Sequence, residues 1–158
     1  MSVLNHPALK TSHLWLPGYV RGRLRQRSAP PPARIWVAFT DHFEPWWHQP
    51  DSATALERVA RWVRAWPEIA ARHADGAGRP PCYTFFYPEE QYHPAAIDGL
   101  RVLRDRGIGD VEVHLHHDSD TPQAFSDRMS VFLERLEGTH GLLRREGGRV
   151  TFGFIHGN

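Results

Sequence analysis

The sequence predicts an α/β fold of parallel β/α units, forming the first half of a β/α barrel. Three observations predict it: four apolar segments of strand length, helical patterns between them, and connections long enough to join parallel strands. The chain has 158 residues, 41% hydrophobic and 23% charged, which is ordinary for one globular domain. We expect residues 1–33 to be a flexible lead-in ending in three prolines, and residues 34–158 to be the folded domain.

Strands and helices are expected to alternate along the folded domain. Helices are expected after Asp51, after His93 and after Thr121, because each position combines a helix-start signal with apolar residues at helical spacing. Pro67 is expected to kink the first helix. Each predicted strand is an apolar or alternating run bounded by turn residues, and the four lie at residues 35–40, 83–87, 111–116 and 150–155.

The fourth predicted strand is followed by only a few polar residues. An eight-unit barrel cut in half would end in this way, so we expect the chain to be the N-terminal part of a longer protein. The alternative is a compact four-stranded sheet.

Titratable residues follow every predicted strand. In parallel α/β folds the carboxyl ends of the strands lie at one edge of the sheet, where functional sites form. Histidines without a shared role would be distributed over both edges, so this pattern predicts a functional site. The residues concerned are Asp41, His42 and Glu44; Glu89, Glu90 and His93; His114, His116, His117 and Asp118; and His156 with Asn158.

The segment from Val111 to Asp118 predicts half of a metal site. Alternate residues of a strand share a face, so His114 and His116 project together, about 6.6 Å apart along the strand. Imidazole and carboxylate groups are the usual ligands of zinc and related metals. We expect a divalent metal, zinc, held by Asp41, His114, His116 and Asp118. The alternative is a solvated strand end that is rich in histidine.

Two segments resemble the polysaccharide deacetylase superfamily. Residues 39–42, Phe-Thr-Asp-His, are similar to that family's first motif, Thr-Phe-Asp-Asp-Gly, but have one aspartate instead of two. Residues 112–116, Glu-Val-His-Leu-His, resemble the start of its second motif and place His116 at its first histidine ligand; the second ligand position holds Asp120. The resemblance covers about residues 34–158 and is strongest to an uncharacterised bacterial branch. It implies that residues 34–158 are a deacetylase-like domain, the first half of a distorted parallel β/α barrel of the glycoside hydrolase and deacetylase type.

The expected chemistry is metal-dependent hydrolysis of an acyl group on a carbohydrate. A metal would polarise the acyl carbonyl and lower the pKa of a water molecule. Asp41 is expected as a ligand or general base and His42 as a general acid or base; a hydrogen-bonded turn is the alternative for both. Trp46, Tyr87 and His156 are expected to contact substrate, although Trp46 would also suit a lid over the core.

A carbohydrate-binding or scaffold domain without catalytic activity is the alternative function, since the first motif has a single aspartate. The net charge of +1 gives no argument for nucleic acid. No segment is long enough to span a membrane or resembles a secretion signal, and Cys82 is the single cysteine, so we expect a cytoplasmic protein. The arginines between residues 21 and 27 suit a solvated tail or a contact with an acidic surface. The sequence leaves the glycan and the oligomeric state open.

Overall fold

The structure is a computed structural model that describes residues 12–26, 33–117 and 119–157. The chain divides into two units between Val37 and Ala38, four residues beyond the expected boundary. The first unit contains helix α2, Ser12–Gln26, where the sequence predicted a lead-in without structure. The leucines and arginines of this segment are good helix formers, and the helix accommodates Pro17 in its interior.

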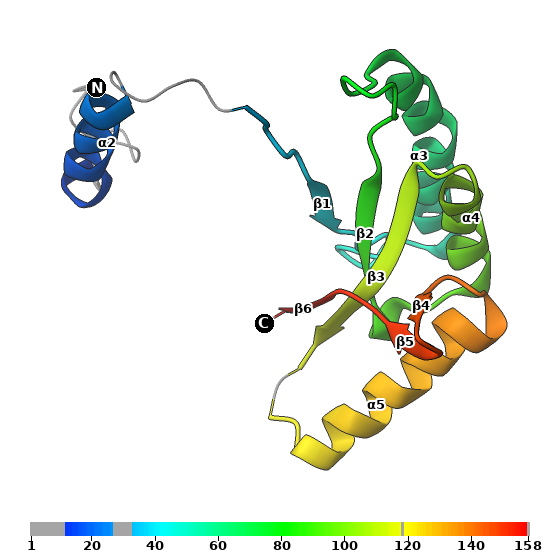
Figure 1. Ribbon diagram of the computed structural model, residues 1–158. Coiled ribbons are helices and arrows are strands. Elements are labelled where there is room, and N and C mark those ends of the chain that lie inside the picture. The colour runs from blue at the N-terminus through cyan, green and yellow to red at the C-terminus, as the bar shows by residue number, and fades with distance from the viewer. Residues whose placement is uncertain (1–11, 27–32, 118, 158) are drawn as a thin grey trace. The chain divides into compact units, whose positions relative to one another are not determined.

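The second unit is built on a curled sheet of four parallel strands, half of a β/α barrel (Figure 1). Its spatial order is β1-β2-β3-β6, and every neighbouring pair is parallel. The predicted fold class is confirmed. The strands are β1, Phe39–His42; β2, Tyr83–Pro88; β3, Gly109–His116; and β6, Phe154–Gly157.

Helices lie on one side of this sheet (Figure 1). Asp51 caps the helix that begins at Ser52 by accepting a 2.7 Å hydrogen bond from the Thr54 amide. Thr121 caps the helix that begins at Pro122 in the same way. Pro67 lies inside one continuous helix and does not divide it. The elements are α3, Ser52–Arg72; the 3₁₀ turn η2, Glu89–Gln91; α4, Pro94–Asp105; α5, Pro122–Glu134; and the π-helical turn η3, Arg135–Thr139.

The hydrophobic core lies between the sheet and these helices. Strand residues Phe85, Val113 and Leu115 are fully buried there, and Leu100 from α4 and Phe132 from α5 are buried with them. Because side chains alternate across a strand, the residues between them project from the opposite, concave face of the sheet. The helices therefore cover one face, and the other face is left for polar residues.

The first strand is shorter than the sequence predicted. Residues 35–38 are not part of a strand, and Ile35 and Trp36 are largely exposed. The register explains this, because within the described ranges β1 pairs only with β2, and that pairing begins with Phe39 opposite Tyr83. An apolar segment without a hydrogen-bonding neighbour has no ladder to join.

The fourth predicted strand is divided into two elements. Strand β5, Arg149–Thr151, pairs antiparallel with β4, Arg144–Glu146, in a small hairpin. Gly147 and Gly148 form its turn, and both have positive φ angles, as a two-residue hairpin turn of this kind requires. The parallel sheet is joined only afterwards, by β6.

The helices in the described parts of the chain include none that is both long and apolar enough to cross a membrane.

Candidate metal centre

Four side chains meet on the concave face, at the carboxyl ends of the strands. His42 ends β1 and Glu44 follows two residues later, while His114 and His116 lie at the end of β3. The ligand atoms of His42, Glu44 and His114 all lie within 4.8 Å of one another. The rings of His42 and His114 have centroids 4.5 Å apart, as do the rings of His114 and His116. We call these four residues the metal cluster.

Three atoms of the metal cluster form a nearly equilateral triangle. The Nε2 atoms of His114 and His116 are 3.2 Å apart. Oε1 of Glu44 lies 3.6 Å from the first and 3.5 Å from the second. All three atoms therefore face a common point.

The outer nitrogens of both histidines have hydrogen-bond acceptors. Nδ1 of His114 lies 2.9 Å from the Ile155 carbonyl oxygen, and Nδ1 of His116 lies 2.5 Å from Oε1 of Glu90. Each Nδ1 is therefore assigned the proton and donates it, which leaves the Nε2 lone pair directed into the triangle. Such outer partners commonly fix the tautomer of a metal-ligating histidine.

Burial disfavours the protonated form of His114. The His114 side chain is fully buried, and this burial lowers the pKa of His114, with further lowering from the neighbouring His116 and His42. Oε2 of Glu44 is also buried and, among the described residues, has no hydrogen-bond partner. When both rings are neutral and protonated at Nδ1, three electron-pair donors converge here. A divalent cation would satisfy all three, so the group could bind a metal.

Strand β6 lies directly against the imidazole rings of His114 and His116. Gly157 pairs with His116 in the sheet, and it is buried. A Cβ atom on Gly157 would lie 2.1 Å from Cδ2 of His116 and 2.9 Å from Cε1 of His114. The position therefore needs glycine because the rings occupy the space of any side chain.

Arg128 of α5 holds the end of β3 in place. Its guanidinium donates to Oε2 of Glu89 at 2.9 Å and 3.0 Å, to Oδ2 of Asp120 at 3.2 Å and to the His116 carbonyl at 3.2 Å. Glu89 stands next to Glu90, so the same arginine fixes the turn that carries the His116 partner.

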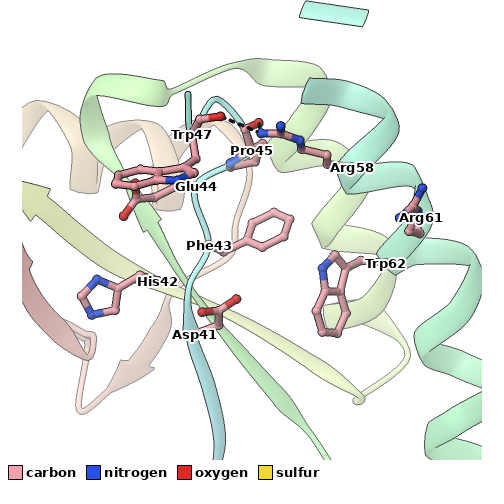
Figure 2. Close-up of a pocket in the computed structure, with 9 residues that line it drawn as sticks. All are labelled: Asp41, His42, Phe43, Glu44, Pro45, Trp47, Arg58, Arg61 and Trp62. Atoms are coloured by element: carbon pink, nitrogen blue, oxygen red, sulfur yellow. Dashed lines mark hydrogen bonds between the residues drawn. The ribbon is translucent and has the colours of Figure 1, made fainter. Parts of the chain in front are cut away.

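The structure does not bring Asp41, an expected ligand, to the metal cluster. Asp41 pairs with Phe85 and His42 with Phe86, so the two side chains project from opposite faces of the sheet. Figure 2 shows Asp41 directed away from His42, on the side of Phe43 and Trp62. Asp118, the other expected carboxylate ligand, lies outside the described residues.

The three residues expected to contact substrate lie elsewhere. Tyr87 is fully buried in the core and its hydroxyl donates to the Gln91 carbonyl at 2.7 Å, so it presents no face to a ligand. Trp46 is half-buried and stacks on the ring of His93. His156 is exposed at the same edge of the sheet, but it pairs with Leu115 and so lies on the face opposite His114 and His116.

Sequence reasoning missed the two glutamates of this site. Glu44 is among the titratable residues that follow the first strand, but it is not one of the expected ligands. The sequence does carry a signal, because His42 and Glu44 have the same two-residue spacing as His114 and His116. Glu90 lies 26 positions from His116, and only the folded structure shows their contact.

An open pocket of about 480 Å³ adjoins the metal cluster around the end of β1 (Figure 2). It is lined by Asp41, His42 and Glu44, by the exposed Trp47, and by Arg58 and Trp62 from α3. Arg58 donates hydrogen bonds to the carbonyl oxygens of Pro45 and Trp47, at 2.7 Å and 2.9 Å. These bonds fix the turn that follows Glu44.

Comparison of the chain with protein-family models, with curated proteins and with solved structures finds no match.

Proposed function

We propose that the protein is a metal-dependent hydrolase that removes an acyl group from a carbohydrate. The observation that carries the proposal is the triangle formed by Nε2 of His114, Nε2 of His116 and Oε1 of Glu44, with edges of 3.2 Å, 3.6 Å and 3.5 Å. Three protein ligands with a remaining open position are typical of catalytic zinc sites.

The triangle favours zinc over magnesium. Ligand atoms about 2.1 Å from a tetrahedral ion are about 3.4 Å apart, whereas octahedral magnesium places neighbouring ligands about 3.0 Å apart. Two of the three edges, 3.6 Å and 3.5 Å, are closer to the first value, and the third, 3.2 Å, lies midway between the two. Two imidazoles and one carboxylate are also a ligand set that zinc accepts readily.

His42 is the proposed general acid or base. Its side chain is exposed, and the centroid of its ring lies 4.5 Å from that of His114. A histidine in this position can take a proton from water and return it to the leaving group, because its ring nitrogens can both accept and donate a proton. The metal would supply Lewis acidity towards the acyl carbonyl and lower the pKa of the attacking water. Asp41 has no part in this proposal, because it lies on the other face.

The carbohydrate part of the proposal is supported by the surroundings of the site and by the sequence resemblance. Trp47 is 57% exposed and lines the pocket next to Glu44. An exposed indole face suits the apolar C–H surface of a sugar ring. The deacetylase-like segments at residues 39–42 and 112–116 contain three of the four residues of the metal cluster, His42, His114 and His116.

The test begins with calorimetric titration of the full chain with zinc. The parent is expected to bind one equivalent, His116→Ala is expected to lose binding, and His73→Ala, an exposed histidine at the end of α3, serves as the matched control. Acetate release from acetylated oligosaccharides, with and without zinc, then tests the reaction. Zinc binding without hydrolysis of any acylated sugar would favour the non-catalytic alternative, and no zinc binding by the parent would overturn the proposal.

A further inference from the structure

The charges of the chain are separated between its two units. Residues 1–37 contain six lysines and arginines and no aspartate or glutamate, while residues 38–158 contain thirteen arginines and eighteen acidic residues. The net charge of +1 therefore combines a segment of +6 with a unit of −5. Such an asymmetry between parts of one chain is typical of a basic segment that contacts an anionic surface.

Helix α2 in the basic segment also exposes large apolar side chains. Leu14 is 73% exposed, Leu24 60% and Tyr19 57%, and Trp15, Leu16 and Val20 are exposed as well. With 100° between successive residues, five of these six positions fall within one half of the helix surface, and Leu14 falls on the other half. The exposed Arg21 lies close to the middle of the other half. Arg23 falls among the apolar positions, where its long side chain can extend past them to a polar surface.

We propose that α2 docks on the surface of an anionic lipid bilayer. Trp and Tyr prefer the boundary between lipid headgroups and hydrocarbon, leucine and valine enter the hydrocarbon, and arginines bind the lipid phosphates. The helix has 15 residues and lies along the bilayer surface without crossing it. Nucleic acid would attract the arginines equally, but it gives Leu16, Val20 and Leu24 no apolar medium to enter.

Vesicle co-sedimentation of the full chain tests this docking. The protein is expected to pellet with vesicles of phosphatidylcholine containing about one quarter phosphatidylglycerol, and to bind at least about tenfold more weakly to phosphatidylcholine alone. Raising the salt concentration from about 0.1 M to about 0.5 M is expected to weaken binding, because the arginine contribution is screened.

Variants separate α2 from general charge effects. The double substitution Arg21→Glu with Arg23→Glu is expected to weaken binding to the anionic vesicles by about tenfold or more. Arg104→Glu with Arg106→Glu makes the same charge change at the same spacing at the end of α4, and is expected to leave binding within about twofold. Equal binding by both double variants would overturn the proposal. So would a parent that ignores anionic vesicles, or one that binds a labelled oligonucleotide through α2 while failing to bind vesicles.

Discussion

Replacing Gly157 by alanine tests the metal cluster without touching a ligand. The new Cβ would lie 2.1 Å from Cδ2 and 2.5 Å from Nε2 of His116, where ordinary contacts begin at 3.4 Å. The ring must therefore move by about 1.3 Å, whereas metal–ligand distances tolerate deviations of about 0.2 Å. We expect His116 to be lost as a ligand while the backbone of β6 remains in place.

The expected loss of zinc affinity is about 100-fold or more, equivalent to about 2.7 kcal/mol. The cost to folding is expected to be smaller, because the obstructing atoms belong to the outer end of a side chain that is 30% exposed and can rotate outwards. Moving the His116 ring also breaks its hydrogen bond to Glu90. The ring therefore loses both its position and the partner that orients it.

Calorimetric zinc titration of the Gly157→Ala variant measures this effect, with urea unfolding to show that the variant is folded. Gly76→Ala is the control, because a Cβ there meets nothing within 4 Å, and its zinc affinity should equal that of the parent. A folded Gly157→Ala variant that binds zinc as tightly as the parent would show that His116 is not a ligand in the described geometry.

Three further predictions concern individual groups of the site. Glu44→Gln is expected to lower zinc affinity by about 100-fold in calorimetry, while Asp41→Asn on the opposite face leaves it unchanged; the reverse order would restore Asp41 as the ligand. Glu90→Gln is expected to lower zinc affinity by about 10- to 100-fold, with unchanged thermal stability of the metal-free protein, because it orients His116; unchanged affinity contradicts this role. The lowered pKa of His114 means that the unfolded chain binds a proton near pH 6.5 and the folded chain only at lower pH, so the free energy of unfolding should decrease as the pH falls below 6.5. Urea unfolding at about pH 5 and about pH 7.5 should show a smaller difference for His114→Gln than for the parent.

The alternation of side chains between the two faces of a strand could be predicted from the sequence. The face shared by His114 and His116, the apolar face of Val113 and Leu115, and the caps at Asp51 and Thr121 all follow from local periodicity and side-chain chemistry. The parallel order of the strands follows from the length of the connections between them. These features depend on residues close together in the chain, so a single sequence is sufficient to predict them.

Relations between strands could not be derived in the same way. Whether Asp41 or His42 faces His114 depends on the register of β1 against β2 and of β2 against β3, and a shift of one residue exchanges the two. The contact between Glu90 and His116 joins residues 26 positions apart, and it depends on how η2 is placed over β3. The division of the last strand was readable, since Gly147 and Gly148 are a hairpin-turn signal.

The metal cluster joins β1 to β3, two strands that are not neighbours in the sheet. Strand β1 is an edge strand held by β2 alone, so its backbone amides depend on a single ladder of hydrogen bonds. A bound ion would connect the residues that follow this edge strand to the centre of the sheet and raise the free energy of local opening along Phe39–His42. The metal would then stabilise the edge of the half-barrel. It would slow amide hydrogen exchange in β1 more than in β3, which is already protected.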